Sequence, residues 1–156
     1  MRIGNGFDAH RFGDDQSRAL WLALVEVPGA PGLEGHSDGD VVTHALCDAM
    51  LGAAGLGDLG RHFPSDDEQW RGAASRLFLD HVLSLIAGSG LVVESGDLTV
   101  ICQRPRLAPY LERMSQALTQ ACGAPIGVKA TTTDYLGAVG RGEGIAAMAV
   151  CLLAAS

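Results

Sequence analysis

The stretch HSDGDVVTHALCDAMLGAAGL, residues 36–56, contains a helix pattern together with its own start signal. Residues 41–56 are mostly apolar and predict a helix, while Ser37 and Asp40 offer oxygens that can cap its N-terminus. His44 lies inside this otherwise apolar helix. An imidazole in such a place is more often a satisfied core residue than a ligand, so the helix by itself leaves both interpretations open.

The segments on either side of this helix predict the rest of the fold. Glycine ends two further helices, and a bulge or break is expected at ESGD, residues 94–97. The predicted strands are 2–12, 18–27, 91–102, 126–133 and 145–155, and the further helices are 73–90 and 108–123.

The resulting order, β-β-α-α-β-α-β-β, is that of a single α+β domain spanning residues 1–156. We expect a two-layer sandwich, in which three helices cover one face of a mixed sheet of four to five strands. The other face of the sheet then needs cover, and a symmetric oligomer is one way to provide it.

Composition limits the class of protein. The chain has 156 residues, of which 47% are hydrophobic and 19% are charged, so a packed core is expected and disorder is not. The net charge of −7 argues against non-specific binding of nucleic acid. No apolar run reaches the length of about 18 residues that a membrane span needs, and the N-terminus lacks the apolar core of a signal peptide.

The cysteines are distributed as in a protein with reduced thiols. Cys47, Cys102, Cys122 and Cys151 are far apart, and no CxxC pair occurs. We therefore expect free thiols in a cytoplasmic protein, with neither a disulfide set nor a zinc knuckle.

The segment GFDAHRF, residues 6–12, offers half of a metal site. In a strand, residues i and i+2 share a face, so Asp8 and His10 are able to hold one ion. His44 is a candidate third ligand, and Asp48, one helical turn later, is placed to hold the ring of His44 through its other nitrogen. On spacing alone this signal is weak, because a polar strand edge and a core histidine explain the same residues.

Segments near the C-terminus carry groups suited to phosphate. KATTTD, residues 129–134, ends a strand with a cation, hydroxyls and a carboxylate, and QRPRLAP, residues 103–109, places two arginines between a strand and a helix. A Thr-rich strand end and a solvated turn are the structural alternatives. GAVGRGEG, residues 137–144, matches no nucleotide-loop motif and is expected to form a sharp turn or an oligomer contact.

Taken together, these motifs resemble the 2-C-methyl-D-erythritol 2,4-cyclodiphosphate synthase family. GFDAHRF, HSDGDVVTHALCDAMLGAAGLGDLGRHFP, KATTTD and GRGEGIAAMAV match it in order and spacing over nearly the whole chain. The resemblance implies a homotrimer with active sites between subunits. It also implies a phosphorus–oxygen lyase of the non-mevalonate isoprenoid pathway.

The implied reaction is an intramolecular phosphoryl transfer. The 2-phosphate of 4-diphosphocytidyl-2-C-methyl-D-erythritol 2-phosphate attacks the β-phosphorus, and CMP leaves. The cofactors implied are one Zn²⁺ per site and Mg²⁺ or Mn²⁺ bound with the substrate. Such cations, with hydroxyl and imidazole donors, offset the repulsion among crowded phosphates.

The resemblance also assigns roles to residues. The zinc ligands match Asp8, His10 and His44, the ligand of the second cation matches Asp134, and the catalytic pair that stabilises the transition state matches His36 and Thr132. Positions that bind the erythritol part, or lie in the loop beside it, match Ser37, Asp58, Leu59, Gly60, Phe63, Pro64, Ser65, Asp66 and Asp67. The cytidine pocket, donated by a neighbouring subunit, matches Cys102, Gln103, Arg104, Pro105, Arg106, Leu107, Ala108, Ala130, Thr131 and Thr133.

Arg141 and Glu143 match residues at the trimer axis, where some members of the family hold an isoprenoid diphosphate. Arg141 is taken as a further substrate-binding residue. The segment LALVEVPGAPGLEG, residues 22–35, lacks the glycine pair that is usual in the family after the second strand, and the chain also departs from the family pattern at three single residues. Asp134 stands where Glu is usual, Arg106 where Lys is usual, and Ala138 where Phe is common.

Two other functions fit the same residues. A metal-dependent phosphohydrolase on this scaffold would release linear phosphates, and a non-catalytic trimer would bind an isoprenoid diphosphate or nucleotide without turnover. Product identity separates the first from the synthase, and turnover separates the second.

Overall fold

The computed structural model describes residues 1–15, 17–64 and 67–156. One mixed sheet of four strands forms its centre: β1 (Arg2–Arg11), β4 (Leu91–Ile101), β5 (Ile126–Thr131) and β6 (Gly144–Ala155). Their order across the sheet is β1-β6-β4-β5. β6 pairs antiparallel with both neighbours, and β4 pairs parallel with β5.

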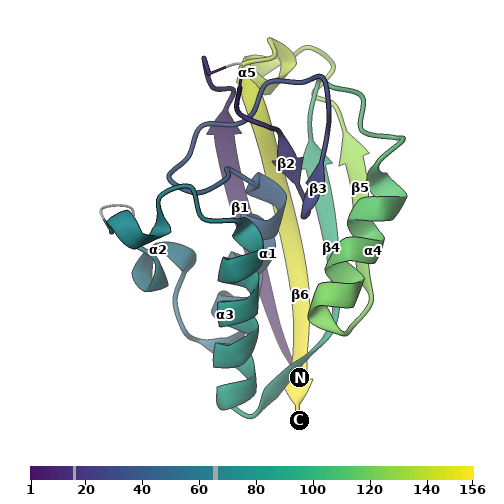
Figure 1. The fold of residues 1–156 in the computed structure, drawn as a ribbon. Helices are drawn as coiled ribbons and strands as arrows, with labels where there is room; N and C mark the ends of the chain where they lie inside the picture. Colours follow the sequence, from purple (N-terminus) through teal and green to yellow (C-terminus); the bar gives the residue numbers. More distant parts are fainter. Residues whose placement is uncertain (16, 65–66) are drawn as a thin grey trace.

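The three long helices are α1 (Val41–Ala54), α3 (Ser75–Gly88) and α4 (Leu111–Cys122). Figure 1 shows all of them on the same face of the sheet. The predicted α+β arrangement with a mixed sheet is therefore confirmed. The predicted bulge also occurs, since the β4–β6 register shifts between Val93 and Ser95.

Helix α1 is the structural centre of the domain. Its N-cap Asp40 accepts hydrogen bonds from the backbone N–H groups of Val42 and Thr43, and Gly55 ends the helix in the left-handed conformation, with a φ of 75°. Ser37, the other predicted cap, instead lies next to the ring of His44. Most of the helix is buried, because it packs against β1 and β6 on one side and α3 on another.

The prediction of one long strand at residues 18–27 was wrong. The chain instead forms a two-stranded hairpin, β2 (Trp21–Leu22) and β3 (Val25–Glu26), separate from the main sheet. Ala23 and Leu24 form the turn with φ of 51° and 64°. Both of their N–H groups donate to the buried carboxylate of Asp40, which stabilises this unusual backbone and ties the hairpin to α1.

In the described part of the chain, three short helical turns occur outside the predicted helices. They are α2 (Leu59–His62), a 3-10 turn (Glu68–Trp70) and α5 (Gly137–Gly140). Among the described residues, no helix is both long and apolar enough to cross a bilayer.

The sheet face opposite the helices carries exposed apolar side chains in the single chain. Ile3, Phe7, Met148 and Val150 alternate along β1 and β6 on this face, with Phe7 opposite Met148 in the register. No described helix covers this face (Figure 1).

Candidate functional site

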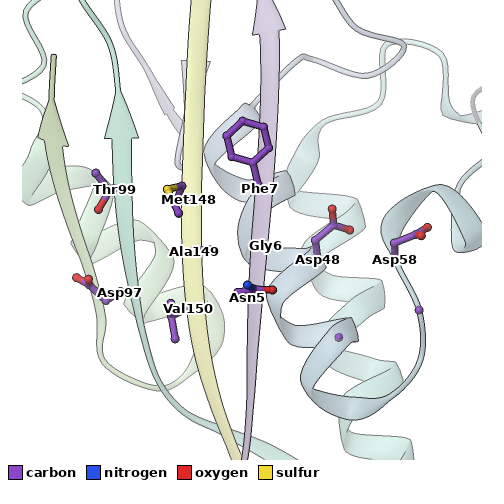
Figure 2. A pocket seen from close by; sticks show the side chains of 12 residues that line it. Asn5, Gly6, Phe7, Asp48, Asp58, Asp97, Thr99, Met148, Ala149 and Val150 are labelled. Carbon is purple, nitrogen blue, oxygen red and sulfur yellow. The ribbon is translucent and has the colours of Figure 1, made fainter. Parts of the chain in front are cut away.

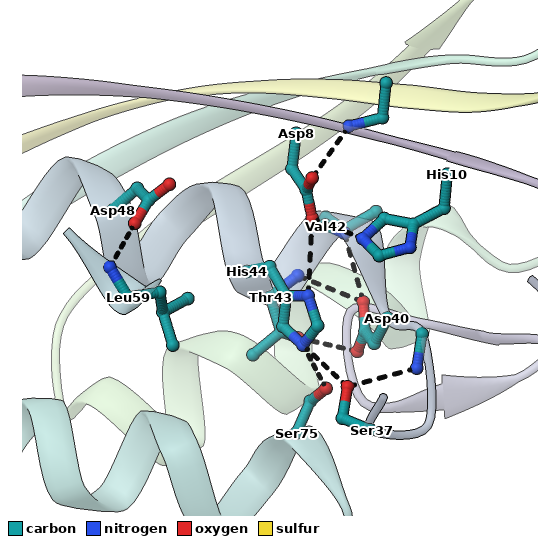
Figure 3. Close-up of polar contacts among 12 residues, drawn as sticks. Asp8, His10, Ser37, Asp40, Val42, Thr43, His44, Asp48, Leu59 and Ser75 are labelled. Atoms are coloured by element: carbon teal, nitrogen blue, oxygen red, sulfur yellow. Dashed lines mark hydrogen bonds and ion pairs between the residues drawn. The ribbon is translucent and has the colours of Figure 1, made fainter. Parts of the chain in front are cut away.

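Strand β1 and helix α1 bring three candidate ligands together. Asp8 and His10 project from β1 toward the helix, and His44 projects from α1 toward the strand (Figure 3). One ligand atom from each residue lies within 4.8 Å of the others. Oδ2 of Asp8 is 2.8 Å from Nε2 of His10 and 3.3 Å from Nδ1 of His44.

Two glycines make this close approach possible. Gly4 and Gly6 lie on the helix-facing side of β1, and a Cβ on either would meet the α1 backbone, at 2.1 Å from the carbonyl oxygen of Ala49 and 2.0 Å from that of Ala45, respectively. The missing side chains let the strand and the helix backbone touch. The next two residues on this face of β1 are Asp8 and His10, which therefore lie at the helix surface.

The fold orients both imidazoles. Nδ1 of His10 contacts the carbonyl oxygen of Glu34 and donates to it, which leaves Nε2 on the side of Asp8 as the atom that can bind an ion. Nε2 of His44 faces the hydroxyls of Ser37 and Ser75, which leaves Nδ1 on the side of Asp8. The sequence suggested that Asp48 holds the ring of His44, but it does not. Its carboxylate instead accepts the N–H of Leu59 at 2.8 Å.

Electrostatics within the cluster favour a charged carboxylate and a cation. Burial tends to raise the pKa of Asp8, but hydrogen bonds and positive charge from His10 and His44 outweigh it and hold this pKa far below its usual range. Burial tends to lower the pKa of His10, yet the hydrogen bond and charge of Asp8 raise it.

Burial, together with the charges of Asp58 and Asp8, raises the pKa of Asp48, although the carboxylate of Asp48 accepts a hydrogen bond from Leu59.

The donor set fits a divalent metal. One carboxylate oxygen and two imidazole nitrogens are ligands that zinc takes in catalytic sites, where a fourth position stays open. The carbonyl of Glu34 supplies the outer hydrogen bond that a metal-bound histidine usually makes. Among the described residues, this is the one such His, Cys, Asp or Glu cluster.

A cavity of about 410 Å³ opens on the cluster. The predicted residues His36, Ser37, Leu59, Gly60 and Phe63 line it together with the three candidate ligands. The lining residues that the sequence analysis missed as site residues are Trp70 and Phe78. Their rings meet that of Phe63 edge-on. An aromatic residue in a short turn, like Trp70, or on an amphipathic helix, like Phe78, gives no signal that separates a pocket wall from a core.

The other residues that were predicted to surround the substrate do not all lie at this cavity. Nε2 of His36 donates to the carbonyl oxygen of Asp67 at 2.9 Å, and Pro64 lies in the same connection. Asp58 caps α2 by accepting the N–H of Arg61, and it lines a separate pocket. Ser65 and Asp66 lie outside the described residues.

The separate pocket lies along the exposed face and edge of the sheet (Figure 2). Asp48 and Asp58 border it on the helix side, and Asp97 and Thr99 of β4 border it on the other. Asp48 lines both this pocket and the metal cavity.

The predicted cytidine-binding segments meet at the far edge of the sheet. The N–H of Cys102 donates to the carbonyl oxygen of Thr131 at 2.9 Å, and Gln103 accepts the N–H of Tyr135. Cys102 and Gln103 begin the first segment, which continues through Arg104, Pro105, Arg106, Leu107 and Ala108, and Thr131 lies in the second, with Ala130, Thr132, Thr133 and Asp134. Arg141 pairs with Glu143 at 2.6 Å in the loop before β6.

These segments lie far from the metal cluster within one chain. Asp8, Ala147, Val100 and Ala130 form one row across the four strands. Neighbouring strands are about 4.8 Å apart, so Ala130 lies on the order of 14 Å from Asp8. Thr132 and Asp134 follow at the end of β5, on the opposite edge of the sheet from the cluster.

The family model and the similar proteins of known name point to the same family. The model of the YgbB family matches residues 1–154. The 2-C-methyl-D-erythritol 2,4-cyclodiphosphate synthase of Nitrosococcus oceani is 53% identical over 98% of both chains, and that of Pseudomonas aeruginosa is 48% identical over 99% of both.

Solved structures that resemble this chain belong to the same family. The bifunctional IspDF of Campylobacter jejuni matches with a TM-score of 0.94 and 39% identity, covering 99% of this chain and 42% of that one. IspF of Plasmodium falciparum in complex with CDP matches with a TM-score of 0.85 and 29% identity, covering 99% and 96%. The chain therefore belongs to the YgbB family, that of the 2-C-methyl-D-erythritol 2,4-cyclodiphosphate synthases, which are lyases of isoprenoid biosynthesis.

Proposed function

We propose that the chain carries out the reaction of its family at the cluster of Asp8, His10 and His44, with one Zn²⁺ bound there. The observation that carries this proposal is the convergence of three ligand atoms within 4.8 Å. In addition, each imidazole has its second nitrogen engaged by the fold. A core histidine needs neither the carboxylate nor the second ring beside it.

The reaction converts 4-diphosphocytidyl-2-C-methyl-D-erythritol 2-phosphate to 2-C-methyl-D-erythritol 2,4-cyclodiphosphate and CMP. A new phosphorus–oxygen bond forms between the 2-phosphate and the β-phosphorus as the bond to CMP breaks. No water is consumed and no protein nucleophile is required. The protein has to hold the two phosphates in line and offset their charge.

Zinc at the cluster, with Mg²⁺ or Mn²⁺ at Asp134, would supply positive charge to the phosphate oxygens. The residues of the chain then orient the substrate. His36 borders the metal cavity, and its Nε2–H can turn from the carbonyl of Asp67 to a phosphate oxygen. Thr132 offers a hydroxyl from the end of β5. Ser37, Leu59, Gly60 and Phe63 line the space for the erythritol part.

We also propose a homotrimer in which neighbouring subunits complete each site. Two observations support it. Within one chain, Thr132 and Asp134 follow the edge strand opposite the one that bears Asp8. The sheet face with Phe7 and Met148 is apolar and exposed. Packing that face against other copies would cover it and bring the end of β5 of one subunit to the cluster of the next.

In such a trimer, the cytidine of the substrate would lie against residues 102–108 and 130–133 of a neighbour. The CDP complex of the Plasmodium falciparum relative supports a cytidine nucleotide as the ligand. Arg141 and Glu143 would lie toward the axis, where some members of the family hold an isoprenoid diphosphate. A cytoplasmic location and a single domain over residues 1–156 stay predictions from the sequence.

Phosphorus NMR of the purified protein with its substrate, Zn²⁺ and Mg²⁺ tests the function. We expect a cyclic diphosphate to appear in step with CMP, and His44→Ala to lose both signals. Linear phosphates would indicate a hydrolase. An unchanged spectrum from folded, zinc-loaded protein would indicate a binding protein.

A further inference from the structure

The outer nitrogen of His44 faces a pair of buried hydroxyls. Nε2 lies 3.0 Å from Oγ of Ser75 and 3.2 Å from Oγ of Ser37 (Figure 3). Ser75 is 0% exposed and Ser37 is 5% exposed. Ser75 is 31 residues from His44 in the sequence and begins helix α3, so the contact arises only from packing α3 against α1.

A carboxylate fixes the direction of the bond to Ser75. The Ser75 hydroxyl donates to Oδ1 of Asp38, and the Ser75 N–H donates to Oδ2 at 2.8 Å. A serine hydroxyl has a single hydrogen, and here the carboxylate takes it. The oxygen of Ser75 can therefore only accept from His44, which requires a hydrogen on Nε2.

We infer that Ser75, held by Asp38, is a positioning residue that keeps His44 with its proton on Nε2 and so makes Nδ1 its metal-binding atom. The inference rests on the proposed metal site. It implies that the two histidines bind through different atoms, because Glu34 holds Nδ1 of His10 and leaves Nε2. A hydrogen-bonded outer nitrogen also raises the basicity of the metal-binding one.

The same contacts have a structural role, which the test has to separate. The N-cap residue of α3, Ala74, makes no side-chain capping bond, and Asp38 takes its place by accepting the N–H of Ser75. Ser75→Ala keeps this backbone bond and removes only the hydroxyl. The matched control is Ser84→Ala, since Ser84 on the same helix gives its hydroxyl to the carbonyl of Asp80 and is exposed.

The first measurement needs no variant. Nitrogen-15 NMR of histidine-labelled protein at pH 8 should show a proton on Nε2 of His44 in both the metal-free and the zinc-loaded protein. In the zinc-loaded protein, Nδ1 should carry the metal. An unprotonated Nε2, or zinc bound through Nε2, would overturn the inference.

The second measurement is zinc affinity by competition with a chromophoric chelator. Ser75→Ala should raise the zinc Kd about 10- to 100-fold, the usual effect of losing an outer-sphere partner, while Ser84→Ala stays within about 2-fold of the unchanged chain. Folded Ser75→Ala protein with an unchanged Kd would overturn the role of Ser75. If the unchanged chain binds no zinc, the proposed metal site fails instead, and the proton on Nε2 in the metal-free protein still decides the inference.

Discussion

Nδ1 of His44 lies 3.3 Å from Oδ2 of Asp8, across the contact between helix α1 and strand β1. This contact joins elements that are far apart in the sequence, and it exists because Gly4 and Gly6 let the helix backbone lie against the strand. The metal cluster therefore depends on residues that carry no functional group. Changes at those glycines should affect the site and the stability together.

Gly6→Ala should strongly destabilise the protein. The new Cβ would lie 2.0 Å from the carbonyl oxygen of Ala45, and backbone atoms cannot move aside as a flexible side chain can. We expect a loss of about 3 kcal/mol in the free energy of unfolding, the upper part of the range for overpacking, measured by urea denaturation. The control is Gly88→Ala, where nothing lies within 4 Å and a small gain is expected. A Gly6→Ala midpoint equal to that of the unchanged protein would contradict this account of the contact.

Zinc should stabilise the folded chain by mass action. A ligand at 100 times its Kd adds about 2.7 kcal/mol if it binds the native state alone. Thermal unfolding should therefore shift upward with added Zn²⁺ and return after chelation. His10→Ala should abolish the shift, while His81→Ala should keep it, because His81 lies outside the cluster. A zinc shift that survives His10→Ala would place the ion elsewhere.

Asp40→Ala should cost more than the loss of an ordinary helix cap. Its fully buried carboxylate accepts from the N–H groups of Val42 and Thr43, and also from those of Ala23 and Leu24 in the hairpin turn. Losing a cap costs about 1–2 kcal/mol, and each buried donor left unpaired adds about 1–3 kcal/mol. We expect at least about 3 kcal/mol in urea denaturation.

Two further variants serve as an intermediate case and a control for Asp40→Ala. Asp40→Asn keeps one acceptor oxygen and should lie between Asp40→Ala and the unchanged chain. Asp15→Ala removes an exposed aspartate and should leave the denaturation midpoint unchanged. Equal midpoints for Asp40→Ala and Asp15→Ala would show that the hairpin does not depend on Asp40.

The free thiols should react slowly until the chain unfolds. Burial raises the pKa of Cys102 and Cys151 from 9.0 to about 11. Burial and the neighbouring Cys151 raise that of Cys122 to about 12, and the pKa of the fully buried Cys47 is also well above 9.0. At pH 8 the thiolate fraction is then on the order of 0.1% or less in the folded chain, against about 10% in the unfolded chain.

Iodoacetamide labelling with and without denaturant measures this difference. Because each folded thiol holds its proton more tightly than the unfolded one, these groups contribute stability below pH 9 that is lost as the pH rises toward 11–12. Rapid native labelling at pH 8 would contradict the assigned burial.

The sequence signals that succeeded were local. Asp40 at the start of α1 and Gly55 after its end mark the helix because capping involves residues within one turn. The i, i+2 spacing of Asp8 and His10 likewise placed both on one face of β1. The hairpin at residues 21–26 was missed because its turn uses Ala23 and Leu24 at positive φ, where the usual signal is glycine or asparagine.

The features that escaped prediction depend on long-range packing. Asp48 had the helical spacing to support His44, but its carboxylate accepts the N–H of Leu59 instead. The hydroxyl that does support His44 belongs to Ser75 on another helix. Sequence spacing describes one helix face well, yet it contains no information on which residue of a second helix will lie against it.

The exposed sheet face supplies the last prediction, which concerns assembly. Phe7 is 60% exposed, and it lies opposite Met148, which is 54% exposed, in the β1–β6 register. If this face packs between subunits, Phe7→Glu places a charge in an apolar interface and should convert the proposed trimer to monomers. Light scattering after size exclusion measures the mass. Activity should fall with the loss of trimer, because in the proposed trimer each site would need the end of β5 of a neighbour.

Leu77→Glu is the matched control for this change. Leu77 is 55% exposed on α3, on the helical side of the domain, so the same charge there should leave both mass and activity unchanged. A folded Phe7→Glu protein that keeps the mass of the unchanged protein would show that the apolar face is not the subunit interface. A monomeric Phe7→Glu protein with full activity would instead show that one chain contains a complete site, against the separation of Asp8 and Thr132 across the sheet.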